Sequence, residues 1–286
     1  MRVFKKFTTF IFVLSLLFFN ASNSYAFSNI SKSFTEIKNI FEQQKCFLNR
    51  AEIDNLKNLY SEDYVSNDGF DKATLFELYK DTLKIHPDIK YDICVTKITV
   101  DGDYATVKTV NKSTATTAEK SVVTNDNGLL SVDMETVFYL KKQNNIWKII
   151  AEQTISERTS LLYGECKKAN IKLYVPEFVS SNKEYIATLE LPENYAKFAM
   201  GSIKQELITY PSDDPGDIFK SFDSAGIVER IFKSNTTGNN ETVAASVAFA
   251  SPCVGANNNL DLKISGLGVL LQRVNVFFEP QKQNKK

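Results

Sequence analysis

The feature that most constrains the fold is a run of alternating apolar and polar residues in the middle of the chain. Two alternating segments, residues 90–100 and 104–112, flank Asp101-Gly102-Asp103, a strong signal for a tight turn between antiparallel strands. In the first segment the apolar residues shift from odd to even positions, and a β-bulge near Thr96–Lys97 would account for the shift. The pattern predicts a long, bulged β-hairpin.

A second hairpin follows in the chain. Residues 132–141 alternate cleanly, and Asn144-Asn145 turns the chain into a further segment over 146–156. The Ser/Thr-rich stretch 113–128 between the two hairpins predicts a loop or an irregular edge hairpin. Four antiparallel strands are therefore expected in this region.

Helical spacing of apolar residues precedes these strands. It predicts helices over residues 34–50, 51–60 and 71–85. Asp71 is a suitable N-cap for the third helix, and Pro87 is expected to end it. The first half of the chain thus combines three helices with an antiparallel sheet, which is an α+β arrangement.

From about residue 170, helical signals fade and short apolar segments alternate with turn-rich clusters. Strands are expected over residues 170–178, 184–191, 195–209, 226–234, 241–250, 260–265 and 269–278. Gly266-Leu267-Gly268 is expected to form a hairpin turn between the last two strands. Many strands with turns between them predict an all-β, sandwich-like domain.

The first residues carry the parts of a secretory signal in the required order. A basic start (Arg2, Lys5 and Lys6) precedes an apolar run over 7–19 and a small-residue-rich stretch that ends at Ala26. The apolar run is shorter than the roughly 20 residues that a helix needs to cross a bilayer. Cleavage after Ala26 is therefore favoured over an uncleaved anchor, and the expected location is the periplasm or the exterior of a bacterial cell.

These signals divide the chain into five parts. We expect a signal peptide, a first domain, a linker, an all-β domain and a disordered tail, over residues 1–26, 27–158, 159–169, 170–280 and 281–286. Two domains are also what the length favours, because about 260 residues exceed what one core usually organises.

Charge and motif content exclude several classes of function. Signal cleavage would remove three basic residues and no acidic ones, so that 34 of each become 31 basic and 34 acidic. A weakly acidic chain without a basic stripe is not expected to bind nucleic acid. The sequence contains no P-loop, no GxGxxG after a strand and no HExxH, so no cofactor is expected.

The cysteines number four: Cys46, Cys94, Cys166 and Cys253. In an exported chain they allow two disulfides with three alternative pairings, and the sequence does not select one. Free thiols are an equal alternative, because a chain of this size needs no covalent crosslinks. The wide spacing, without CxxC, predicts no metal site.

Three short motifs occur in order in the first half. They are Leu59-Tyr60-Ser61-Glu62-Asp63-Tyr64, Val100-Asp101-Gly102-Asp103-Tyr104-Ala105-Thr106-Val107, and Phe138-Tyr139-Leu140-Lys141 with Asn145-Ile146-Trp147-Lys148-Ile149. Over about residues 34–158 they resemble the nuclear transport factor 2-like (NTF2-like), or SnoaL-like, superfamily. The resemblance implies helices and a curved sheet that form a cone with a pocket at its open end. The superfamily includes isomerases, dehydratases, epoxide hydrolases and non-catalytic binding modules, so fold alone does not select a function.

Acidic side chains are the first candidates for catalysis. Asp133, Glu135 and Tyr139 lie on one face of a predicted strand, and Glu152 lies in the next strand. If that face lined the cone, these residues could act as a base with a raised pKa. The opposite face is much more apolar and is the better candidate for packing against the helices, which would leave the acidic face solvated or covered by the second domain.

Tyrosines and one histidine complete the candidates. Tyr60, Tyr64 and Tyr79 could line a ligand pocket, although aromatic residues are also ordinary core residues. His86 is the only histidine, and its place beside Pro87 favours an exposed loop position over a role as general base.

The chain is thus expected to be an α+β protein with a cone-shaped NTF2-like domain, three N-terminal helices on a curved antiparallel sheet, followed by an all-β sandwich-like domain. The favoured function is an exported, non-catalytic binding or scaffold protein for a small molecule, a peptide or a partner protein, with homodimerisation left open. The alternative is a lyase, isomerase or hydrolase that uses acidic and tyrosine pocket residues. A third interpretation has the two domains close the cone against each other, which would make it purely structural.

Overall fold

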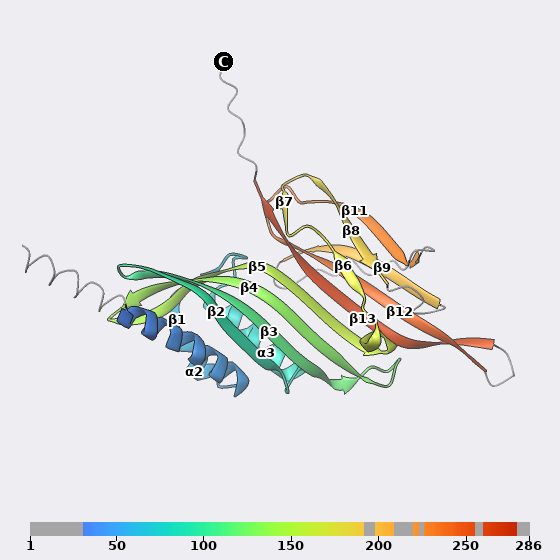
Figure 1. Ribbon diagram of the computed structural model, residues 1–286, viewed down its shortest axis with the longest axis horizontal. Helices are drawn as coiled ribbons and strands as arrows, with labels where there is room; N and C mark the ends of the chain where they lie inside the picture. The colour runs from blue at the N-terminus through green and yellow to red at the C-terminus, as the bar shows by residue number, and fades with distance from the viewer. Residues whose placement is uncertain (1–30, 192–197, 209–219, 223–225, 255–259, 279–286) are drawn as a thin grey trace, which may run out of the picture.

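The computed structural model describes residues 31–191, 198–208, 220–222, 226–254 and 260–278. Within these residues the chain is mostly β, with antiparallel pairing predominant and few helices (Figure 1). The predicted signal peptide and C-terminal tail lie outside the described residues.

A ten-stranded sheet runs through both halves of the chain (Figure 1). Its first-half strands are β1 (Tyr60–Ser66), β2 (Lys90–Asp101), β3 (Tyr104–Lys120), β4 (Asn127–Gln143) and β5 (Ile146–Gly164). Its second-half strands are β7 (Phe178–Ser180), β9 (Phe198–Leu207), β10 (Lys220–Ser221), β12 (Glu241–Val254) and β13 (Leu260–Phe277). The spatial order is β10-β9-β12-β13-β5-β4-β3-β2, and β1 and β7 pair in parallel with β5 and β13. A separate three-stranded sheet contains β6 (Lys172–Tyr174), β8 (Glu184–Glu190) and β11 (Ile227–Lys233).

Helices cover one face of the first-half strands (Figure 1). They are a helix over residues 31–49, α2 (Ile53–Lys57) and α3 (Lys72–Ile85). Asp71 caps α3 as predicted, because its carboxylate accepts a hydrogen bond from the Thr74 backbone N–H at 2.8 Å. The predicted second helix is shortened to α2, since Tyr60 already begins β1, where it pairs with Ile149.

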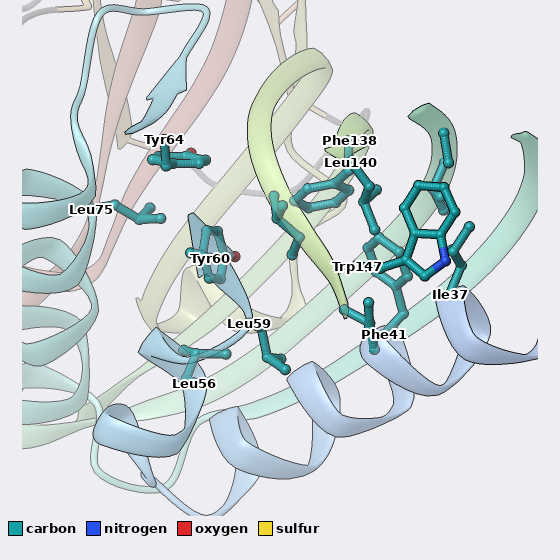
Figure 2. Close-up of a cluster of buried hydrophobic side chains, with 14 of the residues drawn as sticks. Ile37, Phe41, Leu56, Leu59, Tyr60, Tyr64, Leu75, Phe138, Leu140 and Trp147 are labelled. Carbon is teal, nitrogen blue, oxygen red and sulfur yellow. The ribbon is translucent and has the colours of Figure 1, made fainter. Parts of the chain in front are cut away.

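Apolar side chains pack between these helices and the sheet (Figure 2). Phe41 of the first helix packs edge-on against Phe138 of β4, with ring centroids 5.2 Å apart. Tyr60 makes similar contacts with Tyr64 and Phe76, at 5.1 and 5.3 Å. Burial of each such side chain contributes roughly 2 kcal/mol, so this core fixes the helices on the sheet.

A second core lies between the small sheet and strands β9, β12 and β13, on the opposite face of the large sheet from the helices (Figure 1). Glu241 is completely buried there. Its carboxyl oxygens accept hydrogen bonds from the Tyr185 hydroxyl, the Gln205 amide, and the backbone and side-chain N–H of Asn235, at 2.6–3.0 Å. This carboxyl group is therefore fully matched by donors from the protein.

The two halves are joined by paired strands. Residues 159–164, which were predicted to belong to a linker, continue β5 and pair with β13, with Thr159 opposite Leu271. A single 3-10 turn, Glu165–Lys168, follows β5. Because one sheet spans both halves, a self-contained second β-sandwich is not confirmed.

The segment 113–128 forms an irregular hairpin, one of its two predicted alternatives: residues 113–120 continue β3, and the pairing with β4 shifts register between Thr116 and Lys120. The predicted turn Gly266-Leu267-Gly268 is strand instead and lies within β13. A Cβ atom on Gly266 would lie 2.8 Å from the backbone nitrogen of Cys166, and one on Gly268 would lie 3.0 Å from Leu162 Cδ2. These glycines therefore serve close packing inside a strand, a role that turn rules do not distinguish from a hairpin.

The four cysteines are all free thiols, and none of the considered pairings is formed. Cys94 is exposed, Cys46 and Cys253 are half-buried, and burial raises the pKa of the Cys166 thiol to about 12. Among the described residues, no helix is long and apolar enough to cross a membrane. The same residues contain no group of three or more His, Cys, Asp or Glu placed to bind a metal.

Candidate functional site

A cavity of about 440 Å³ lies between the helices and the inner face of the first-half strands. Its walls are mostly apolar or aromatic and include Leu48, Tyr79, Tyr91, Val132, Met134 and Phe138. Polar side chains also reach it, among them Gln44, Asn111, Thr136, Glu152 and Glu157. Leu271 of β13 contributes to the lining, so the second half helps to enclose the cavity without filling it. A cavity of this size, apolar with a few polar groups, is typical of small-molecule sites.

The register of β5 explains why two glutamates face the cavity. β5 has two bulges against β4, at Ile150 and Ile155, where the pairing shifts by one residue. Each bulge changes whether odd- or even-numbered side chains face inward, so Glu152 and, after the second bulge, Glu157 point to the same side. The carbonyl of Ile155 accepts a hydrogen bond from Asn275 of β13 at 2.7 Å. The second half of the chain therefore holds the bulge that presents Glu157.

Glu152 lines the cavity while keeping some access to solvent through it. Loss of hydration raises its pKa from 4.5 to about 7. The nearby Tyr64 hydroxyl lowers this pKa in part. The negative charge of Asp68 raises it further, and the positive charge of Arg273 lowers it. The Glu152 carboxyl therefore titrates near neutral pH, where it can accept or donate a proton.

Glu157 is the second carboxyl of the cavity. Burial raises its pKa as well, and the charge of Arg273 opposes this shift. The Thr159 hydroxyl donates a hydrogen bond to Glu157 Oε1 at 3.4 Å. Among the described residues, none of the ion pairs involves Glu152 or Glu157.

A buried ion pair lies beside these glutamates. Two guanidinium nitrogens of Arg273, on β13, lie 2.6 and 2.9 Å from the carboxylate oxygens of Asp68, in the turn after β1, and the side chains are 3% and 11% exposed. Arg273 Nε donates to Asn275 at 2.8 Å, and Asn240 donates to Asp68 at 2.8 Å. The pair joins residues 205 positions apart and has all its strong partners within the protein.

Two amide side chains present unpaired acceptors. Gln44 is 2% exposed and donates through Nε2 to the Tyr60 hydroxyl at 2.8 Å, which leaves Oε1 without a partner. Asn111 donates to the Thr136 hydroxyl at 3.4 Å, and its Oδ1 is also unpaired. A buried polar atom without a partner costs about 1–3 kcal/mol. These oxygens mark places where a donor from a ligand would be favourable.

The structure separates the acidic residues that the sequence grouped as candidates. Asp133, Glu135 and Tyr139 lie on the outer face of β4, away from the cavity, and only Glu152 of that set lines it. The side chain of Asp133 is 60% exposed, and Asp133 and Glu135 lie 3.5 and 2.6 Å from lysines of β3. The apolar face of β4 packs under the helices, as its composition predicted.

The tyrosine and histidine candidates lie at or beside the cavity. Tyr79 lines it, and Tyr60 and Tyr64 are almost completely buried next to it. Burial raises the pKa of all three phenols, so they remain protonated at neutral pH. His86 is the C-cap residue of α3 and lines the cavity, half-buried rather than in an exposed loop, with Nδ1 3.3 Å from the Thr116 carbonyl oxygen.

Sequence reasoning missed Glu157, Gln44, Asn111 and Arg273. A signal for Glu157 existed in the broken alternation of β5, of the same kind as the shift that predicted a bulge in β2. That β2 bulge is confirmed by the change of register between Val95 and Lys97. No local pattern pairs Arg273 with a residue more than 200 positions away.

A second hollow, of about 360 Å³, lies on the outer face between β6 and strands β4, β5 and β13. Asp133 and Arg158 line it, but both are exposed and already lie beside an opposite charge. It lacks the buried, unpaired groups of the cavity, so the cavity is the better candidate site.

No protein-family model and no curated protein matches this chain. Solved structures similar to it are NTF2-like proteins of the dehydratase type, over about 43% of the chain. Hexachlorocyclohexane dehydrochlorinase LinA-type3 from Novosphingobium barchaimii is 12% identical, over 43% of this chain and 85% of that chain, with a TM-score of 0.35. A proposed dehydratase of the NTF2-like family from Streptomyces avermitilis is 12% identical, over 43% and 95%, with a TM-score of 0.36. These likenesses concern part of the chain and assign no residue a role.

Proposed function

We propose that this protein binds a small, largely apolar molecule in the cavity between its helices and its sheet, with Glu152 as the polar anchor. The observation that carries the proposal is the Glu152 carboxyl itself. It lies among apolar walls without an ion pair, where its charged form is disfavoured. A carboxyl of this kind lowers the stability of the fold, and it can instead serve to bind a ligand.

The rest of the chain supports this site. In the proposal, the sandwich-like second half holds the cavity wall through the Arg273–Asp68 pair and the hydrogen bond from Asn275 to the bulge of β5. The protein acts outside the cytoplasm, as the signal predicted over residues 1–26 implies. Purely structural closure of the cone is less well supported, because a ligand-sized volume remains beside Leu271.

Native mass spectrometry of the full chain, purified from its exported fraction, tests the binding proposal. We expect a bound small molecule on the wild-type protein. Met134→Trp should abolish its retention, because Met134 lines the cavity, and the matched variant Val137→Trp, on the outer face of the same strand, should retain it. A protein without any bound small molecule, or equal retention in both variants, would contradict the proposal.

Proton-transfer catalysis is the second candidate, favoured by the Glu152 pKa of about 7. If Glu152 acts as a base, a C–H group of the bound molecule should exchange with deuterium in D₂O, as followed by NMR. Exchange should stop in Glu152→Gln and continue in Glu135→Gln, whose site is on the outer face. Absence of exchange in the wild-type protein would leave binding as the function.

A further inference from the structure

The charges around the cavity are unbalanced. Two carboxyl groups, those of Glu152 and Glu157, line it, whereas no lysine or arginine does among the described residues. The guanidinium of Arg273, whose charge acts on both glutamates, is bound on two nitrogens by Asp68 and on the third by Asn275. It therefore cannot also neutralise a carboxylate or phosphate group of a ligand.

The unpaired amide oxygens also favour a ligand that carries hydrogen-bond donors. Gln44 is 2% exposed, lines the cavity, and has its Oε1 without a partner. The half-buried Asn111 also lines the cavity, and its Oδ1 has no partner either. Both atoms are acceptors. A ligand that satisfies them must bring N–H or O–H donors, and a ligand that brings acceptors would leave them unpaired.

We infer that the cavity selects an organic cation, a protonated amine with an apolar body, whose ammonium group is held by Glu152 and Glu157. This inference rests on the proposed function and names its ligand class. The N–H donors of the ammonium group match Gln44 Oε1 and Asn111 Oδ1, while the apolar body contacts the hydrocarbon walls. The aromatic rings that line the cavity attract a cation further.

Proton linkage gives the inference a distinct signature. An ammonium group favours the ionised form of Glu152, so binding below about pH 7 should release a proton from this residue. The groups that face Glu152 are the phenols of Tyr64, Tyr60 and Tyr79, which stay protonated in this range, and the Asp68–Arg273 pair. Glu157 adds a release of the same sign. The remaining titratable groups on the lining are His86 and Tyr91, and burial raises the pKa of Tyr91 to about 12.

The test is a set of matched triples in which one carbon skeleton carries an ammonium, a hydroxyl or a carboxylate group. Hexyl, octyl, cyclohexylmethyl and 4-phenylbutyl skeletons span the size of the cavity. Binding to the full chain is measured by isothermal titration calorimetry at pH 6 and pH 8.5, in two buffers that differ in ionisation enthalpy. Glu152→Gln and Glu157→Gln are compared with Glu135→Gln, the matched carboxyl on the outer face.

For at least one skeleton, we expect the amine to bind at least tenfold more tightly than the alcohol at pH 8.5, and the carboxylate to bind least. Proton release should appear at pH 6 and disappear in Glu152→Gln, which should also lose the preference for the amine. Glu135→Gln should behave as the wild-type protein does. If an alcohol binds and no amine binds more tightly, the inference fails and the proposed function stands. If no member of any triple binds, the proposed function fails with it.

Discussion

The C-terminal core and the cavity both contain glutamates, but the protein surrounds these carboxyl groups in opposite ways. Glu241, in the C-terminal core, accepts four hydrogen bonds from Tyr185, Gln205 and Asn235. Glu152, in the cavity, forms no ion pair with any described residue, and burial raises its pKa to about 7 although the Tyr64 hydroxyl nearby lowers it. A carboxyl group whose oxygens are all hydrogen-bonded by the protein stabilises the fold. A carboxyl group with few partners beside a cavity is available to bind a ligand.

A second contrast lies across β4 and β5. The outer carboxyls Asp133 and Glu135 face solvent and lysines, and the inner ones, Glu152 and Glu157, face apolar walls. The same residue type therefore has different consequences on two faces of one sheet. The following substitutions break or sharpen these comparisons, from the largest expected effect to the smallest.

Glu241→Ala should cause the largest loss of stability. It leaves buried donors of Tyr185, Gln205 and Asn235 without an acceptor, at a combined cost of about 4 kcal/mol. Urea unfolding of the full chain measures the change. A decrease in the free energy of unfolding of less than about 1 kcal/mol would show that the Glu241 hydrogen bonds contribute little to stability.

Arg273→Met should destabilise the protein by about 3 kcal/mol, because it leaves the Asp68 carboxylate buried without its partner. The double variant Asp68→Asn/Arg273→Met should recover part of this loss, since the isolated charge is then removed. The same unfolding measurements form a double-mutant cycle. Additive effects of the two substitutions would contradict direct coupling between the halves of the chain at this pair.

Glu152→Gln should stabilise the protein at high pH. A carboxyl whose pKa rises from 4.5 to about 7 on folding binds more protons in the folded state over that window, so wild-type stability falls as pH rises through it. The full penalty is about 3 kcal/mol and is present above pH 7. The variant should therefore be more stable than wild type at pH 8, by up to that amount, and similar at pH 4. Loss of stability at pH 8 would mean that Glu152 serves structure as Glu241 does.

Asp133→Asn should change stability by no more than about 0.5 kcal/mol at any pH between 5 and 8, because its side chain is 60% exposed and its lysine neighbour is 3.5 Å away. The same pH series of unfolding curves measures it. A pH-dependent effect as large as that of Glu152→Gln would remove the distinction between the two faces.

Local patterns predicted much of the first half and little of its site. The Asp101-Gly102-Asp103 hairpin, the Asp71 cap and the apolar inner face of β4 follow from near neighbours in sequence, and each is present. The site depends on two bulges in β5, at Ile150 and Ile155. Bulges cancel the alternation that identifies a face, so a strand with two of them assigns its charged residues to faces unreliably.

In the second half, too, local sequence patterns fail where the structure depends on contacts between residues far apart in the chain. Gly266 and Gly268 read as a turn because turn rules consider only adjacent residues, while their role is set by Cys166 and Leu162 across the sheet. The ion pair of Asp68 with Arg273 and the continuity of one sheet through both halves depend equally on distant partners. Short-range patterns do not contain such information, which is why they predict a self-contained second β-sandwich that the structure does not confirm.

The most direct test of the central claim is an NMR titration of the Glu152 carboxyl carbon in the full chain, assigned by comparison with Glu152→Gln. We predict a midpoint near pH 7 in the free protein. Saturation with an amine that binds the cavity should lower that midpoint, because the ammonium group favours the ionised carboxyl. A midpoint near 4.5 in the free protein, the ordinary value for a solvated glutamate, would contradict the account of the cavity as a site with an unsatisfied carboxyl.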